Sequence, residues 1–173
     1  NGYWNDPEAT NATIIDGWVH TGDIGEFDED QYLKITDRKK DIIVNAGGDN
    51  ISPSRIEEKL NIEPEIAQSM LYGDFKNYLV AIIVPDKEQA MAWATKNNKS
   101  NNLKLLIKDQ DFIKFIKEVT SKVNTKLSVI EQIRKFILID EEFTIENDMM
   151  TPTMKVKRFK VKSIFGDKLE KLY

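Results

Sequence analysis

Cysteine is absent from the 173-residue chain, and histidine occurs only once, as His20. The absence of cysteine excludes disulfides, thiolate metal sites and cysteine nucleophiles. No apolar run approaches the roughly 20 residues that a membrane-spanning helix needs. The formal net charge of -4 gives little support to a dedicated nucleic-acid-binding protein, because such domains are usually basic. We therefore expect no nucleic-acid partner.

The first ten residues, NGYWNDPEAT, have neither the basic n-region nor the apolar h-region of a secretion signal. They also lack an initiator methionine, so we expect a sequence entered part-way through a longer protein. The composition is 40% apolar and 31% charged, which is typical of a soluble globular protein. This length accommodates one ordinary domain and a remnant of another.

Two hairpins and a capped helix are predicted in the first third of the chain. The second hairpin has the pair Gly47-Gly48 at its tip. A helix should follow, with Ser52 as its N-cap and Pro53 in the first helical position, where a missing N–H costs nothing. Glu57, early in that helix, is expected to complement the helix dipole. The hairpin strands are expected at residues 24–27 with 32–35, and at 41–44 with 50–51.

Three apolar β-type runs predict the main sheet, and helical spacing of apolar residues predicts its cover. We therefore predict an α+β fold: a small domain with a β-hairpin and a three-stranded sheet covered by helices. Residues 1–37, mostly turn-rich before residue 18, are assigned to the C-terminal edge of a larger preceding domain. Residues 38–173 are assigned to the small domain. The strands are expected at 66–72, 78–84 and 133–139, and the helices at 86–93, 112–127 and 158–172.

Two motifs near the predicted domain boundary suit the binding of a ribose or a phosphate. In HTGD, the carboxylate of Asp23 is able to accept hydrogen bonds from two vicinal ribose hydroxyls. In DRKKD, Arg38 is able to fork onto a ribose or a phosphate. Each has an ordinary structural alternative, which is a turn with a capping aspartate for the first motif and a solvated charge cluster for the second.

Two further motifs are chemically open when each is taken alone. The glycine pair permits close approach of a ligand or of another chain segment, and it equally suits an ordinary hairpin turn. In TPTMKVKRFKVK, residues 151–162, Lys155 or Lys157 is able to bring a compact positive charge to a phosphate. The alternative for this stretch is a basic amphipathic tail that is solvated or touches an anionic surface.

Taken together and in order, four blocks of sequence resemble the adenylate-forming acyl-CoA synthetase superfamily. They are GYW..PEAT, DGWVHTGD, DRKKDIIVNAGGDNISPSRIE and TPTMKVKR, and the last is similar to the long-chain fatty acyl-CoA ligase branch. The resemblance implies the C-terminal part of an AMP-forming ligase. Such an enzyme converts a fatty acid and ATP to an acyl-adenylate, and then transfers the acyl group to CoA. It also implies Mg²⁺, and no residue of this chain is assigned to a metal.

The resemblance implies roles for individual residues before position 50. Asp23 and Arg38 match the residues that hold the ribose of ATP or AMP. Lys40 falls at the hinge about which the C-terminal domain rotates. Gly47 and Gly48 lie in the loop that, in similar enzymes, lines the pantetheine tunnel of CoA after that rotation.

The catalytic lysine of the superfamily is matched best by Lys155, which follows Thr153 by two residues. Most of the superfamily has glycine directly before this lysine, whereas this chain has Met154. Lys157 therefore remains the second candidate for the catalytic position.

The resemblance also implies partners and a location. The partners are the fatty acid, ATP, CoA and the N-terminal adenylation domain of the same protein, which holds the phosphate loop and the acyl pocket. The chain alone is expected to be inactive. We expect a cytoplasmic location, either in solution or in peripheral association with the inner face of a membrane. The alternatives are another adenylate-forming enzyme, such as an aryl-CoA ligase or a peptide-synthetase adenylation domain, and a non-catalytic module that binds an anionic surface.

Overall fold

A computed structural model describes residues 2–173 and divides the chain into two compact units. The first unit ends at Ile42, and the second runs from Ile43 to Tyr173. The assignment of residues 1–37 to the edge of a larger domain stays a prediction. Within residues 2–173, no helix is long and apolar enough to cross a membrane.

The first unit contains one helix and two hairpins. The prediction that residues before position 18 are mostly turns is wrong for α1, which begins where Asp6 accepts a hydrogen bond from the Ala9 N–H at 2.8 Å. The predicted hairpin at residues 24–35 is confirmed as the antiparallel pair β3–β4. The elements of this unit are α1 Pro7–Thr13, β1 Ile14–Ile15, β2 Trp18–Val19, β3 Asp23–Phe27 and β4 Leu33–Arg38.

Apolar side chains of the first unit stay exposed. Trp4 is 97% exposed, Trp18 77% and Tyr32 72%, and no apolar side chain between residues 2 and 42 is buried. A unit without a buried apolar residue has no hydrophobic core of its own.

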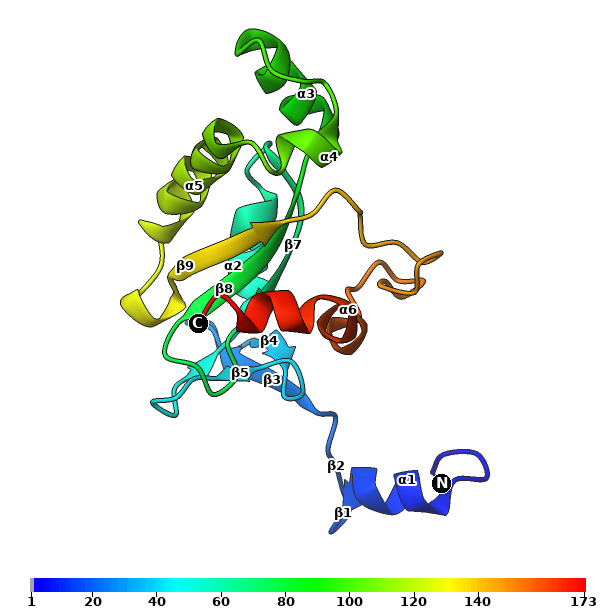
Figure 1. The fold of residues 1–173 in the computed structure, drawn as a ribbon. Helices are drawn as coiled ribbons and strands as arrows, with labels where there is room; N and C mark the ends of the chain where they lie inside the picture. Colours follow the sequence, from blue (N-terminus) through cyan, green and yellow to red (C-terminus); the bar gives the residue numbers. More distant parts are fainter. Residues whose placement is uncertain (1) are drawn as a thin grey trace. The chain divides into compact units, whose positions relative to one another are not determined.

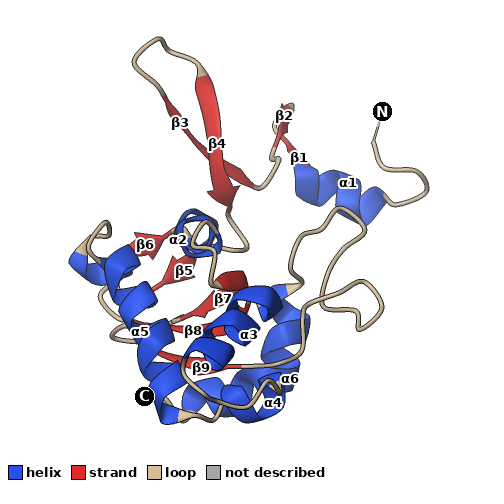
Figure 2. Ribbon diagram, turned by 90° about the horizontal axis from the view of Figure 1, so that it is seen from above, coloured by secondary structure: helices blue, strands red, loops and turns tan. Residues whose placement is uncertain are grey.

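The second unit is built on the predicted three-stranded sheet, in the order β7-β8-β9 (Figure 1). Strand β8 pairs antiparallel with β7 and parallel with β9. Figure 2 shows the short β5–β6 hairpin beyond β7, beside α2. The α+β class and the hairpin at the glycine pair are confirmed. The bounds are β5 Ile43–Val44, β6 Asn50–Ile51, α2 Pro53–Asn61, β7 Ile66–Tyr72, β8 Leu79–Pro85, α3 Lys87–Lys96, α4 Leu103–Leu106, α5 Gln110–Asn124, a 3₁₀ turn Val129–Glu131, β9 Ile133–Leu138 and α6 Arg158–Glu170.

Every residue of β8 is buried, because helices cover both faces of the sheet. Alternate side chains of a strand point to opposite faces. Leu79, Ala81 and Ile83 join α2, α3, α4 and α5 in one apolar cluster, whereas Val80 and Ile82 join α6 in another. Figure 1 shows α5 and α6 on opposite sides of the sheet. The sheet is therefore a rigid middle layer from which the loops of the second unit project.

Candidate functional site

Asp23 and Arg38, the two predicted ribose-binding residues, lie directly opposite each other in the β3–β4 hairpin. Arg38 Nε is 3.4 Å from Asp23 Oδ1, and both side chains are accessible to solvent. Gly22 precedes Asp23 with a φ of +76°, a conformation that favours glycine. Its carbonyl accepts a hydrogen bond from the Lys39 N–H at 2.8 Å, which ties the HTGD turn to the end of β4. The hairpin thus presents a carboxylate beside a guanidinium.

Lys40, the predicted hinge residue, is exposed in a turn that directly follows β4. The Arg38 carbonyl accepts hydrogen bonds from Asp41 N–H at 2.9 Å and from Ile42 N–H at 3.2 Å. The division between the two units falls directly after Ile42. The turn that holds Lys40 therefore lies next to the boundary, and its role as a hinge stays a prediction.

The glycine loop at the tip of β5–β6 is held by the side chain of Asn45. The oxygen Asn45 Oδ1 accepts hydrogen bonds from the N–H groups of Gly47 and Asp49, both at 2.9 Å. The amide Nδ2 donates to Asp49 Oδ2 at 3.0 Å. Gly48 has a φ of +85°, whereas Gly47 has a negative φ. Turn geometry therefore favours glycine at position 48 in particular.

Gly48→Ala is expected to destabilise the second unit by about 1 kcal/mol, because an L-residue is strained at positive φ. A Cβ at this position meets open space, so backbone strain alone causes the loss. The matched control is Gly47→Ala, where the added Cβ lies 3.3 Å from Asn45 Oδ1 and φ is ordinary. Urea unfolding of both variants measures the difference. An equal loss at the two positions would show that crowding, and not φ, sets the requirement.

Lys155 lies at the end of a closed loop between the sheet and α6. The Thr151 N–H donates to the Lys155 carbonyl at 2.8 Å, and the Lys155 N–H donates to Thr151 Oγ1 at 3.0 Å. An isolated antiparallel bridge between Met150 and Val156 closes the base of the loop. Lys155 is exposed, and within residues 2–173 its ammonium has no ion pair or hydrogen bond. The loop thus holds the backbone of Lys155 and leaves its charge free.

Met154 has a φ of +60°, which is the left-handed region that glycine occupies most easily. The superfamily that the sequence resembles usually has glycine at this position, directly before its catalytic lysine. Val156, directly before Lys157, has no such conformation and is part of a β-bridge. The backbone therefore favours Lys155 over Lys157 as the residue that matches the superfamily lysine.

Lys157 is engaged with Asp148 and stands at the N-cap position of α6. Its ammonium forms a short ion pair with Asp148 Oδ1, and Lys160 Nζ lies 3.7 Å from the other carboxylate oxygen. The hydrogen bond from Lys157 is the main reason that the pKa of Asp148 is held below its usual range. Lys157 is therefore paired, whereas the ammonium of Lys155 is unpaired within residues 2–173.

Arg158 and Glu57 form a bidentate ion pair that sequence reasoning missed. Arg158 Nη1 donates to Glu57 Oε1 at 2.8 Å, and Nη2 lies 2.5 Å from Oε2. Glu57 Oε1 also accepts the Leu71 N–H at 2.6 Å, and Glu57 is only 8% exposed. The expectation that Glu57 lies early enough to complement the dipole of its helix is wrong, because α2 has no acidic residue in its first turn. The Glu57 carboxylate instead contacts α6 and β7. The pair fixes the first residue of α6, three positions after Lys155.

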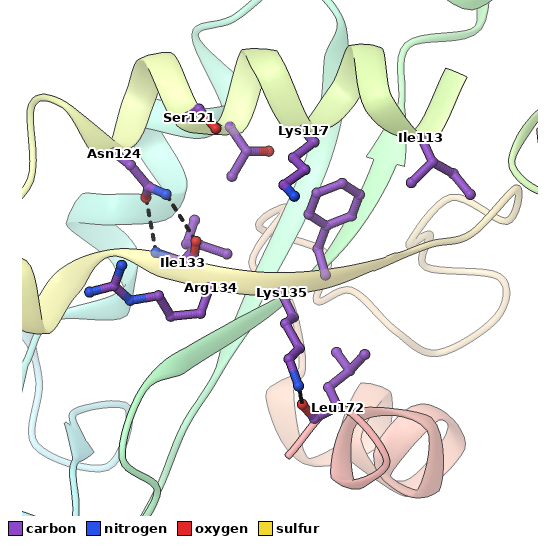
Figure 3. A pocket seen from close by; sticks show the side chains of 10 residues that line it. Ile113, Lys117, Ser121, Asn124, Ile133, Arg134, Lys135 and Leu172 are labelled. Atoms are coloured by element: carbon purple, nitrogen blue, oxygen red, sulfur yellow. Dashed lines mark hydrogen bonds between the residues drawn. The ribbon is translucent and has the colours of Figure 1, made fainter. Parts of the chain in front are cut away.

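A cavity of about 400 Å³ between α5 and β9 contains none of the predicted site residues (Figure 3). The side-chain amide of Asn124 bonds to both the N–H and the carbonyl of Ile133, each at 2.9 Å. Lys135 extends to the opposite side of β9, where its ammonium bonds to the Leu172 carbonyl. These polar groups hold β9 at the edge of the sheet. The cavity is not assigned a role in the binding of nucleotide, CoA or acyl groups. Within residues 2–173, no group of three or more metal-ligating side chains occurs.

Comparisons with known proteins agree with the fold. The family model described as "AMP-binding enzyme C-terminal domain" matches residues 40–173. The chain is 40% identical to long-chain-fatty-acid–CoA ligase FadD15 of Mycobacterium tuberculosis, over the whole chain and 29% of that protein. It is 37% identical to human long-chain-fatty-acid–CoA ligase 1, over 99% of the chain and 25% of that protein. The adenylation domain of a carboxylate reductase from Mycobacterium chelonae superposes with a TM-score of 0.85 at 27% identity, covering 99% of this chain and 26% of that one.

Proposed function

This chain belongs to the AMP-binding enzyme C-terminal domain family, and from that premise we propose that it is part of an AMP-forming long-chain fatty acid–CoA ligase. The chain spans between a quarter and three-tenths of the length of the relatives with that activity, so the reaction is proposed for a longer protein. The observation that carries the proposal is the free ammonium of Lys155 on a loop that holds its backbone in place.

In the first half-reaction, a fatty carboxylate attacks the α-phosphorus of ATP and pyrophosphate leaves. Negative charge gathers on the phosphoryl oxygens, and a positioned positive charge stabilises it. Lys155 supplies that charge. Asp23 and Arg38, paired across β3–β4, hold the ribose, since a carboxylate accepts from two vicinal hydroxyls. Mg²⁺ enters the proposal as the ion that accompanies ATP, and no residue of this chain is assigned to it.

In the second half-reaction, the CoA thiol attacks the carbonyl carbon of the acyl-adenylate and AMP leaves. Lys155 has to withdraw so that the thiol is able to enter, and rotation of a small domain accomplishes both changes. The turn at Lys40, next to the boundary of the second unit, absorbs that rotation. The glycine loop at Gly47 and Gly48 then lines the path of the thiol.

The exposed apolar side chains of the first unit support its assignment to a larger N-terminal adenylation domain. Trp4, Trp18 and Phe27 are each at least 67% exposed, and the unit buries no apolar residue between positions 2 and 42. Exposed apolar side chains in a unit without a core of its own are typical of a segment that another part of the protein covers. A cytoplasmic location, with peripheral association at the inner face of a membrane, belongs to the same proposal because long acyl chains partition into bilayers.

The basic stretch at residues 151–162 gives little support to the rival function of binding an anionic surface. Lys157 and Lys160 pair with Asp148, and Arg158 pairs with Glu57. The ammonium of Lys162 lies 5.1 Å from the centre of the Tyr72 ring. Most of the positive charge is thus satisfied inside the domain. Lys155 is the exception.

A half-reaction assay on the longer protein tests the proposed function. With ATP and a C16 fatty acid we expect pyrophosphate release, and with added CoA we expect the acyl thioester. Benzoate and an amino acid serve as controls for an aryl-CoA ligase and for a peptide-synthetase adenylation domain. The 173-residue chain alone should show neither step. Turnover by this chain alone, or activity with the control acids and none with fatty acids, would reject the proposal.

A further inference from the structure

The turn between β7 and β8 holds the glycine hairpin in place. Val44 N–H donates to Asp74 Oδ1 at 3.1 Å, and Phe75 N–H donates to the Val44 carbonyl at 2.8 Å. Ala46 N–H, directly before the two glycines, donates to the Lys76 carbonyl at 3.0 Å. The hairpin itself has only two residues in each strand. Because two such short strands are marginally stable alone, these three bonds contribute to fixing its direction.

The segment that follows α6 binds the same β7–β8 turn. The hydroxyl of Tyr173 lies 3.1 Å from each of the carbonyl oxygens of Tyr72 and Tyr78, the residues that bracket the turn. The rings of Tyr173 and Tyr78 are 4.9 Å apart. Lys76 Nζ lies 4.8 Å from the centre of the Tyr173 ring, within reach of a cation–π contact. Tyr173 therefore contacts both ends and the middle of the turn.

Glu170, in the last turn of α6, adds charged contacts to this arrangement. Its carboxylate accepts the hydroxyl of Tyr72 in a short hydrogen bond and pairs with Lys76 Nζ at 2.6 Å. The pKa of Glu170 lies below its usual range, chiefly because of the hydrogen bond from Lys76, so the carboxylate is charged at neutral pH. Burial, with Glu170 nearby, raises the pKa of Tyr72 to about 12, so the phenol remains a donor.

We propose that Tyr173 and Glu170 are positioning residues for the CoA half-reaction, acting through the β7–β8 turn on the loop of Gly47 and Gly48. Neither residue has to touch a substrate. Tyr173 and Glu170 fix the position of the β7–β8 turn. The turn fixes the position of the glycine hairpin, and the hairpin lines the path of the thiol. The proposal rests on the function proposed above, because it takes from it the role of the glycine loop. It places control of the second step more than 100 residues away in sequence from that loop.

Tyr173→Phe in the full-length enzyme is the test, because it removes the hydroxyl and keeps the ring. The loss of one such hydrogen bond corresponds to about a fivefold change. We expect the KM for CoA to rise by about that factor, with the rate of adenylate formation and the KM for ATP unchanged. Glu170→Gln should act in the same direction. Lys171→Ala is the matched control, since this neighbouring side chain is exposed and has no ion pair within residues 2–173.

Amide hydrogen exchange on the same variants separates this inference from the proposed function. We expect residues 43–51 to exchange several-fold faster in Tyr173→Phe than in the wild type, and residues 79–85 to be unaffected. Unchanged exchange at 43–51, or equal losses in both half-reactions, would overturn the positioning role. If the wild-type enzyme formed no CoA thioester, the proposed function would fail. Faster exchange would then still establish the connection from Tyr173 to the hairpin.

Discussion

Lys155→Ala in the full-length enzyme is expected to slow adenylate formation by about two to three orders of magnitude, the usual effect of removing one group that stabilises a developing oxyanion. The physical reason is the free ammonium of Lys155, whose backbone is held by Thr151 on both sides. Thioester formation from a supplied acyl-adenylate should be nearly unchanged, because the proposed rotation removes Lys155 from the site before that step. Pyrophosphate exchange and single-turnover thioester formation measure the two steps separately.

Lys157→Ala is the control for this experiment. Its ammonium is already paired with Asp148, so its loss is expected to change adenylate formation much less. A larger effect at Lys157 than at Lys155 would move the catalytic position by two residues. Equal losses of both half-reactions in Lys155→Ala would indicate damage to the fold and contradict the assigned role.

Glu57→Ala is expected to lower the free energy of unfolding of the chain by about 3 kcal/mol, the scale of leaving a buried charge without its partner. The change removes both carboxylate oxygens from Arg158 and the acceptor from the Leu71 N–H. Glu57→Gln should cost less, because an amide oxygen still accepts one of these bonds. Equilibrium urea unfolding gives the values.

Glu58→Ala is the matched control for this prediction, since Glu58 is the next residue in α2 and is exposed. Such a surface change is expected within about 0.5 kcal/mol of the wild type. A double-mutant cycle with Arg158→Ala isolates the coupling between the two partners. If Glu57→Ala cost no more than Glu58→Ala, the ion pair would not anchor α6.

The elements of the second unit were predictable where a single segment carries its own signal. The stripe from Phe112 to Leu127 predicted α5, and the apolar run at residues 78–84 predicted the strand β8. The helix α1 was missed because its sequence, PEATNAT, has no apolar periodicity. The signal that would have found it was local, namely Asp6 at the N-cap and Pro7 in the first helical position.

The sequence motifs name the candidate site residues, whose roles stay predictions, and the contacts of these residues come from the structure alone. The sequence motifs pointed to Lys155, but only the backbone conformation of Met154 and the ion pair of Lys157 distinguish the two lysines structurally. Glu57 and Arg158 are separated by 101 positions, and no pattern in one sequence connects two charges at that distance. Tyr173 and the carbonyls of Tyr72 and Tyr78 were beyond sequence reasoning for the same reason, since a backbone acceptor has no residue signature.

The parallel pairing of β8 with β9 has a consequence for the order in which the chain acquires its structure. Leu79 pairs with Ile133, so this edge of the sheet closes only after the whole intervening helical segment has been made. During synthesis the β7–β8 ribbon forms early, from neighbouring residues, while its face toward α6 waits for the last stretch of the chain. Met70, Val80 and Ile82 lack their α6 cover in that interval, so the nascent ribbon is prone to aggregate until residues 158–170 have been made.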